Sequence, residues 1–424
     1  MKLLENEEYR SRSKTGRMGA FTRNRKLAFK KLIVFLTRGG MKSLQRELDA
    51  FYKEVTGSEF NVRKVTKGAL SQARSQLKPE AFLELNENVC QTFYDEAPYW
   101  VWKGYRLLAV DGTRLLLPKH KTIIEEFGEY GFGPNADSKR SIAIASMLYD
   151  VLNLVTLDAQ LAPFDFSERD LLNRHVPFLK KGDLLLLDRG YPSIALFYLL
   201  RYLGVDFCVR MKEDWWLTVK EFSESGEKDR IVKFDLPKKD RTLFGGHLEM
   251  INSPVTCRLI SVTLPGGQKE ILCTSLTDTE KHGYNDFPDL YHLRWNEEEA
   301  YKLLKSRAEI ESFTGKTALA VKQDFFARIF AMSYCSILAF PIEEKVRQEY
   351  TEDKNKHPQK INRTNALAMF RNISIGLLDK GNINGAIEAF DTIAFNTREI
   401  VRPGRKNERK KRPKKLHYMN YKAL

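Results

Sequence analysis

The pattern of hydrophobic and polar positions divides the chain into helical and strand-like stretches. Residues 42–95 are predicted to be helical throughout, with Ser43 and Thr66 in position to cap helices. From about residue 102 the period changes, and apolar runs bounded by turn residues predict buried strands. These runs are YRLLAVDGTRLLLP, SIAIASMLYD, VLNLVTLDAQL and GDLLLLDRGYPS.

A helix that Ser167 can cap lies between the last two strands, and IALFYLLRYLG follows as a second helix. Three hairpin-linked strands, a helix, a further strand and another helix predict a mixed α/β sheet. Residues 206–285 break this order, because the runs there alternate or are β-branched. About five strands are predicted in them, from FCVRM, WLTVKEF, RIVKFDL, TCRLISVTL and EILCTSL. We expect this β-rich insertion to stand outside the mixed sheet.

Helices are predicted again near the C-terminus. FFARIFAMSYCSILAF is an apolar helical run, and two amphipathic helices are expected within 362–397. The chain is therefore predicted to contain a helical N-terminal region, a core in two pieces, an insertion and a helical C-terminal region. Their bounds are 1–95, 100–205 with 286–345, 206–285 and 346–424.

The stretch YHLRWNEEEAYKLLK is predicted to form one helix. At about 100° per residue, four of its side chains fall within a sector of roughly 60°. They are Tyr291, Arg294, Glu298 and Lys305. Leu293, Ala300 and Leu304 lie near the opposite side and can pack. Two cations, an aromatic and a carboxylate suit a phosphate backbone together with a metal ion. The alternative is a solvated amphipathic helix.

Charge indicates a polyanionic partner. The net charge is +15, and residues 9–46 contain twelve Lys or Arg but no Asp or Glu. The run 402–415 adds nine basic residues and one acid, and is expected to be disordered when free. Nucleic acid is the first candidate partner and a membrane surface the second. A disordered solubilising arm is the alternative for 9–46, and a merely soluble basic protein is the alternative for the whole chain.

With nucleic acid as the partner, residues 1–95 are predicted to form a basic arm and a helical DNA-binding region. The helix that Thr66 can cap carries outward Gln, Ser and Arg and resembles a major-groove reader, although surface helices often look the same.

Two further observations bear on location. No run approaches about 18 apolar residues, so no membrane span is expected. The five cysteines are odd in number and lack metal-site spacing, which is typical of reduced thiols in a cytosolic protein.

Two aspartates are the main candidates for chemistry. Asp111 and Asp188 are each predicted to end an apolar strand, where a side chain stays accessible while its strand is fixed in the core. Glu298 would bring a third carboxylate from a helix. Three such acids form an oxygen site suited to Mg²⁺ or Mn²⁺, and two ions can support in-line phosphoryl transfer. Either aspartate alone could instead be an ordinary turn or cap residue.

At these residues the sequence resembles the DDE transposases of the insertion sequence 4 family. VDGT at Asp111, LDRGY at Asp188 and the spacing Y-x2-R-x3-E-x6-K match that family's motifs in order. The gaps are 188 − 111 = 77 residues and 298 − 188 = 110 residues. The resemblance covers roughly residues 65–345, plus RPGR at Arg402. Many relatives have an acid or a Thr after the first aspartate, whereas here Gly112 follows it and puts a role for that neighbour in doubt.

The resemblance implies an RNase H-like catalytic core in which Asp111, Asp188 and Glu298 bind two Mg²⁺ or Mn²⁺ ions. It also implies that Tyr291, Arg294 and Lys305 bind DNA at the transposon end near the cleavage point.

Members of this family with an insertion use a hairpin step in which an aromatic holds a flipped base. Trp215 and Trp216 are the candidates here. The alternative is that one of this pair is core and the other an exposed strand aromatic. Trp295 is expected to be packed, and His175 to be a satisfied polar residue rather than a ligand.

The predicted function is therefore a cut-and-paste DNA transposase of the bacterial cytoplasm, associated with the nucleoid. Its partners would be double-stranded DNA, as transposon ends and target, and a second copy of the chain on that DNA. Three alternatives remain open: an RNase H-like host nuclease without strand transfer, a transposase-derived DNA-binding protein, and an RNA-associated basic protein.

Overall fold

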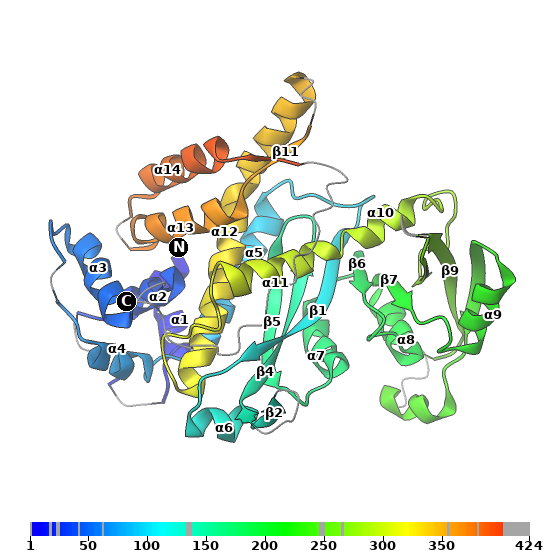
Figure 1. The fold of residues 1–424 in the computed structure, drawn as a ribbon, viewed down its shortest axis with the longest axis horizontal. Helices are drawn as coiled ribbons and strands as arrows, with labels where there is room; N and C mark the ends of the chain where they lie inside the picture. Colours follow the sequence, from blue (N-terminus) through cyan, green and yellow to red (C-terminus); the bar gives the residue numbers. More distant parts are fainter. Residues whose placement is uncertain are drawn as a thin grey trace.

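A mixed sheet runs through the computed structural model, with helices on both of its faces and a helical lobe at one side (Figure 1). It has eight strands in the order β5-β4-β1-β6-β7-β10-β9-β8. β1, β6 and β7 are mutually parallel, and the other pairs are antiparallel. The structure describes residues 2–401 apart from 17–18, 23–25, 41–42, 62, 133–137, 246–250, 264–266, 354–356 and 380.

The strands of the large sheet are β1 (Arg106–Leu116), β4 (Ile142–Asp150), β5 (Val155–Pro163), β6 (Asp183–Leu187), β7 (Asp206–Met211), β8 (Asp229–Phe234), β9 (Val255–Thr263) and β10 (Lys269–Thr274). Two small antiparallel pairs join β2 (Tyr130–Phe132) to β3 (Ser138–Arg140), and β11 (Gln359–Lys360) to β12 (Glu399–Ile400). The predicted mixed α/β sheet is confirmed.

The helices before the insertion are α1 (Glu7–Arg12), α2 (Phe29–Arg38), α3 (Leu44–Thr56), α4 (Lys67–Arg74), α5 (Glu80–Glu96), α6 (Lys121–Phe127), α7 (Glu168–His175) and α8 (Ile194–Leu203). The helix inside the insertion is α9 (Leu217–Ser225), and those after it are α10 (Asp286–His292), α11 (Trp295–Ser306), α12 (Ala318–Asp353), α13 (Arg363–Leu378) and α14 (Ile383–Asn396). Thr66 and Ser167 cap α4 and α7 as predicted, since each side chain accepts a backbone N–H of the first turn. Ser43 precedes α3 but makes no such bond.

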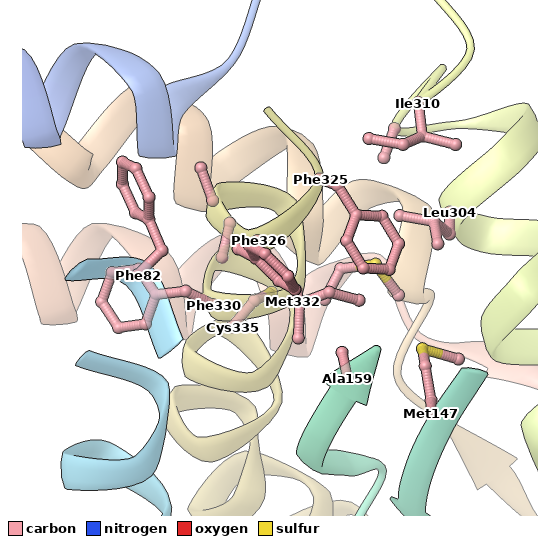
Figure 2. Packing of buried hydrophobic residues seen from close by; sticks show 14 of the residues in the cluster. Phe82, Met147, Ala159, Leu304, Ile310, Phe325, Phe326, Phe330, Met332 and Cys335 are labelled. Atoms are coloured by element: carbon pink, nitrogen blue, oxygen red, sulfur yellow. The ribbon is translucent and has the colours of Figure 1, made fainter. Parts of the chain in front are cut away.

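Each face of the sheet carries its own hydrophobic core. Alternate residues of β1 point to opposite faces: Leu107 and Ala109 join the core under α11 and α12, whereas Leu108 and Val110 join the core under α8. Figure 2 shows phenylalanines of α12 packed beside the strands that carry Met147 and Ala159. Ala318–Tyr350 is apolar and long enough to cross a membrane, but 67% of its most apolar window is buried inside the protein. The helix α12 is therefore the central core helix.

The insertion differs from the prediction in two ways. WLTVKEF lies largely in helix α9, where Val219 and Phe222, three residues apart, share one buried face. The remaining runs form four strands, and these belong to the large sheet because β10 pairs with β7. The expectation that the insertion stands outside the sheet is wrong. The sheet continues through β10 because β7 would otherwise have an unpaired edge.

The basic segment near the N-terminus is folded where the structure describes it. Its apolar residues Leu32, Ile33 and Val34 are fully buried in α2, which packs against α12 and α13. The predicted partial helix is confirmed, and the alternative of a disordered arm does not apply to these residues. The basic run 402–415 and Arg402 lie outside the described residues.

The helix α4 is anchored to the core through its last residue. Arg74 is 5% exposed and pairs with Asp324 of α12 at 2.8 Å. Its guanidinium also donates to Gln323 and to the carbonyl of Ala320, at 2.8 and 2.7 Å. A major-groove reader would need this arginine at the surface, so Arg74 is a structural residue.

Candidate active site

Asp111 lies inside β1 and not at its end, so that part of the prediction is wrong. β6 ends at Leu187 opposite Val110, whereas β1 continues to Leu116 because β4 pairs with it there. Asp111 is thus the first residue of β1 beyond the end of β6, and Asp188 is the first residue after β6. Both aspartates still lie at the same edge of the parallel strands, as expected for a ligand site.

The signature stretch forms two helices rather than one. α10 ends at His292, α11 begins at Trp295, and Leu293 and Arg294 form a turn between them. The turn allows Tyr291 to reach the end of β6, where its hydroxyl donates to the carbonyl of Leu187 at 3.2 Å. Tyr291 and Arg294 are both 5% exposed, whereas Trp295 is 44% exposed. The expectation that Trp295 is packed is therefore wrong.

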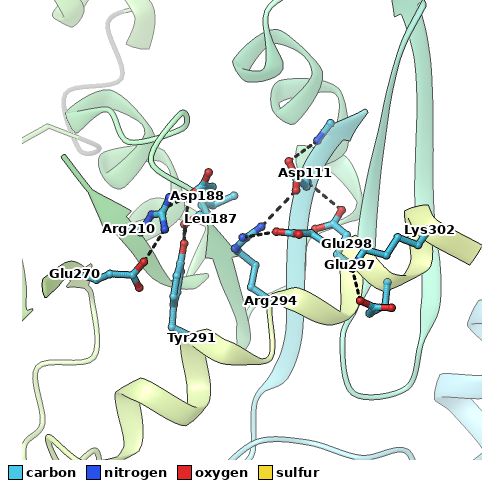
Figure 3. A network of polar contacts seen from close by, with 12 residues as sticks. Asp111, Leu187, Asp188, Arg210, Glu270, Tyr291, Arg294, Glu297, Glu298 and Lys302 are labelled. Carbon is cyan, nitrogen blue, oxygen red and sulfur yellow. Dashed lines mark hydrogen bonds and ion pairs between the residues drawn. The ribbon is translucent and has the colours of Figure 1, made fainter. Parts of the chain in front are cut away.

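Arg294 joins two of the predicted metal ligands (Figure 3). Its Nη1 lies 3.3 Å from Oδ2 of Asp111, and its Nη2 lies 2.9 Å from Oε1 of Glu298. A second arginine, Arg210 of β7, lies 3.1 Å from Asp188. Each predicted ligand is thus paired with a guanidinium. Arg210 was missed in the sequence because nothing in the run FCVRM distinguishes it from a surface arginine.

A buried acid, Glu297, supports Asp111 through its backbone. Its side chain is fully buried, and its Oε1 accepts the backbone N–H of Asp111 at 2.9 Å. Tyr301, one turn further along α11, donates its hydroxyl to the carbonyl of Asp111 at 2.7 Å. Burial raises the pKa of Glu297 well above its ordinary value, and the charge of Asp111 adds to the shift. Sequence analysis missed both residues, although they lie four apart on the packing face of the helix.

The carboxylates at this edge are close enough to repel one another. Burial raises the pKa of Asp111, and Asp188 and Glu298 raise it further, while the N–H of Gly112 and Arg294 oppose the shift. Within the described part of the chain, no three His, Cys, Asp or Glu side chains are arranged to hold a metal ion as they stand. Carboxylate oxygens are nevertheless the donors that Mg²⁺ and Mn²⁺ prefer, so the chemistry of the set fits such an ion.

Lys305 lies further along α11, beside the extended part of β1. Its Nζ donates to the carbonyl of Arg114 at 2.7 Å, and burial lowers its pKa. Arg114 is three residues beyond Asp111 on the same strand. Lys305 is thus held against β1, and among the described residues it forms no ion pair with Asp111, Asp188 or Glu298.

The two adjacent tryptophans have different surroundings. Trp216 packs edge-on against Phe197 and Phe234, at 5.7 and 5.1 Å between ring centroids. Trp215 is 40% exposed in the turn before α9, with Lys212 over its ring at 4.9 Å. Trp216 is thus the core member, and Trp215 is an exposed aromatic on a turn and not on a strand.

His175 is a satisfied polar residue, as predicted. It is fully buried, with Nδ1 at 2.7 Å from Asp158 and Nε2 at 2.9 Å from Ser146. These bonds fix α7 to β4 and β5.

Comparisons with known proteins agree with the motifs. The family model described as "Transposase DDE domain" matches residues 102–335. The "Transposase InsG for insertion sequence element IS4" of Escherichia coli (strain K12) is 24% identical over 275 residues, which are 63% of this chain and 60% of that protein. The chain thus matches about three-fifths of the length of this relative. A cryo-EM structure of piggyBac transposase in a synaptic complex with hairpin DNA aligns with a TM-score of 0.46 and 9% identity, over 91% of this chain and 80% of that one. Because the family model spans more than half of the 424 residues, the chain belongs to the transposase DDE domain family.

Proposed function

We propose that the protein is a DNA transposase that binds the inverted-repeat ends of an insertion sequence and moves it by cut-and-paste cleavage and strand transfer. The observation that carries this proposal is the meeting of Asp111, Asp188 and Glu298 around two arginines, inside the segment that matches the family model. Cleavage would free a 3′-hydroxyl at the transposon end, which then attacks the opposite strand to form a hairpin and later the target DNA.

Asp111, Asp188 and Glu298 would hold two Mg²⁺ or Mn²⁺ ions. Bound there, such ions make a water or 3′-hydroxyl more nucleophilic and stabilise the leaving oxygen of the phosphodiester. Arg294 supplies the positive charge between Asp111 and Glu298, so these acids become available when its guanidinium moves to another anion. A DNA phosphate is such an anion, since guanidinium groups bind phosphate as well as carboxylate.

The remaining signature residues would position the DNA. Lys305 is a cation close to the carboxylates, and Tyr291 supports the loop of Asp188 through the carbonyl of Leu187. Trp215 is the better candidate for stacking on a flipped base, because Trp216 is partly buried and packed against the core. The basic segment 9–46 and the run 402–415 would bind the phosphate backbone on either side.

Two DNA ends joined in one complex require at least two copies of the chain, so a homodimer on DNA is part of the proposal. The site of action would be the bacterial cytoplasm, at the nucleoid.

A host nuclease of the same fold remains the second candidate, because the same carboxylates could cut DNA without joining it.

The test is a cleavage and joining assay with purified protein and Mg²⁺. The substrate is a labelled DNA that carries the sequences flanking the coding region, where short inverted repeats are expected. We expect cutting at the repeat and transfer of the labelled end to a second DNA. Asp188→Asn should bind the end and fail to cut it, because an amide is a poor ligand for a hard cation. Near wild-type cutting by Asp188→Asn would sink the site assignment, and cutting without joining would favour the nuclease.

A further inference from the structure

We propose that Glu168 is a fourth carboxylate of the catalytic centre and binds the divalent cation together with Asp111 and Asp188. The inference rests on the proposed metal-dependent function and extends it to a residue outside the signature motifs.

The position of Glu168 is between the two segments that carry the catalytic aspartates. A Cβ built on Gly112, next to Asp111, would lie 3.1 Å from Oε1 of Glu168. A Cβ built on Gly190, two residues after Asp188, would lie 3.2 Å from Oε2 of Glu168. Both distances are tighter than ordinary contacts, so glycine at 112 and 190 leaves room for this carboxylate. Glu168 thus occupies the space that a side chain at position 112 would take, beside the backbone of Asp111.

The helix α7 that carries Glu168 is held firmly in this position. Arg169 donates to the carbonyls of Gly190 and Pro192 at 3.1 and 2.9 Å, which docks the first turn of α7 on the loop of Asp188. At the other end of α7, buried His175 pairs with Asp158 at 2.7 Å. The helix is therefore fixed at both ends, and Glu168 is directed to the edge of the sheet by its fold.

Glu168 differs from the other acids in its lack of a partner. Asp111 and Glu298 share Arg294, and Asp188 pairs with Arg210. Among the described residues, no hydrogen bond or ion pair is formed by the carboxylate of Glu168. Burial raises the pKa of Glu168, and Asp111 and Asp188 raise it further, while the charge of Arg114 opposes the shift. A half-buried carboxylate beside two others is stabilised by a cation.

An independent observation comes from Tyr191. Its side chain is 1% exposed, and its hydroxyl has no hydrogen-bond partner among the residues that the structure describes. Burial raises the pKa of this phenol, and Glu168 and Asp111 are the next contributors. The backbone N–H of Tyr191 donates to the carbonyl of Asp188 at 3.1 Å, so this residue belongs to the loop of the second aspartate. A buried hydroxyl without a partner at such a place indicates a polar ligand that the protein binds there.

A purely structural role for Glu168 makes a different prediction. As the first residue of α7 it could simply interact with the helix dipole. Glu80 is the matched control, because it is the first residue of α5, is exposed, and lies in a helix that contributes no residue to this site.

The experiment measures Mn²⁺ binding to the full chain by electron paramagnetic resonance of free Mn²⁺, with thermal unfolding in parallel. Glu168→Gln should weaken Mn²⁺ binding by at least about 10- to 100-fold, because loss of a residue that only supports a metal ligand already has an effect of that size. It should also remove the rise in Tm that Mn²⁺ causes in the wild type. Without Mn²⁺ its Tm should equal or exceed that of the wild type, because repulsion with Asp111 and Asp188 is relieved. Glu80→Gln should leave Mn²⁺ binding unchanged.

Wild-type Mn²⁺ binding by Glu168→Gln, together with loss of binding by Asp188→Asn, would overturn the role of Glu168 and leave the proposed function intact. A wild type that neither binds Mn²⁺ nor cuts DNA would overturn both. Glu168→Asp keeps the charge but withdraws the carboxylate by one methylene, and it serves as the test if Glu168→Gln does not fold. We expect weakened binding from Glu168→Asp, and wild-type binding would contradict direct ligation.

Discussion

The backbone N–H of Asp111 donates to the carboxylate of Glu297 across 2.9 Å, and this bond joins β1 to α11 over 186 residues of sequence. Glu298, the next residue, thereby has its place relative to Asp111 determined by a buried contact and not only by its own ion pair with Arg294. The relative position of the Asp111 and Glu298 carboxylates thus depends on Glu297, which would not itself touch the cation.

Replacing Glu297 should therefore affect stability and the site together. Glu297→Leu leaves the N–H of Asp111 without its acceptor, which should lower the free energy of unfolding by about 1–3 kcal/mol. Glu297→Gln keeps an acceptor oxygen and should cost less. Urea denaturation measures the free energy of unfolding of both variants. Equal losses of stability would show that the hydrogen bond from Asp111 to Glu297 does not contribute to stability.

The same residue gives a pH dependence with a defined sign. The folded protein raises the pKa of Glu297 well above its ordinary value of 4.5, so the folded state holds a proton that the unfolded state has lost. The stabilising contribution is complete below pH 4.5 and is lost as the pH rises through the folded pKa. Glu297→Gln has no such proton, so its stability should fall less between pH 4.5 and neutrality. If the stability of the variant and of the wild type changed with pH in the same way, Glu297 would not be the group that causes this pH dependence.

Lys305 and Glu298 should respond differently to substitution by alanine. Lys305→Ala removes a positioning contact worth about 1–3 kcal/mol and should slow cleavage roughly 10- to 100-fold, without rescue by added Mg²⁺. Glu298→Ala removes a proposed ligand and should be inactive at every Mg²⁺ concentration. Cleavage rates across an Mg²⁺ series separate the two, and equal activities would refute this division of roles.

Arg74 should be needed for stability rather than for reading DNA. Arg74→Ala leaves buried Asp324 unpaired and should cost about 3–5 kcal/mol. Lys67→Ala, at an exposed position of the same helix, should change stability by no more than about 0.5 kcal/mol. Denaturation measures both effects. If α4 lies on DNA, Lys67→Ala alone should weaken binding at unchanged stability.

Salt dependence tests the C-terminal basic run. DNA affinity should fall with salt at a log–log slope of about −0.9 for each phosphate that the protein neutralises. Deleting residues 402–424 should make this slope shallower, because nine basic residues between Arg402 and Lys415 are lost. Fluorescence anisotropy at several salt concentrations gives the slope, and an unchanged value would show that this run does not contact DNA.

The features that were predicted correctly from the sequence are those that depend on the local pattern of residues. The apolar runs of β4, β5 and β6 and the caps Thr66 and Ser167 follow from residue type and spacing. The meeting of Asp111 and Asp188 follows from two apolar strands in one parallel pair. These features need only short-range information together with the general rules of α/β sheets.

What the sequence did not predict depends on partners far along the chain. The pairing of β10 with β7 cannot be inferred from the period of either strand, so the insertion was placed outside the sheet. Glutamate is usually a surface residue, so nothing in the sequence was a reason to select Glu168 or Glu297. Only their contacts with β1 and its neighbours place them beside the site. Trp295 was expected to be packed from its place on one continuous helix, but a turn at Leu293 and Arg294 divides that helix and Trp295 is exposed.

The packing of α2 against α12 and α13 has a consequence for synthesis of the protein. The 363 − 38 = 325 residues between Arg38 and Arg363 must be translated before α2 meets α13, which takes roughly 15–65 s at about 5–20 residues per second. Until α12 is translated, the buried residues Leu32 and Ile33 of α2 lack both of these helices, and until α13 follows they lack the second of them. Chains interrupted before α12 should therefore be captured by chaperones or proteases, and only complete chains would deliver a finished catalytic centre to DNA.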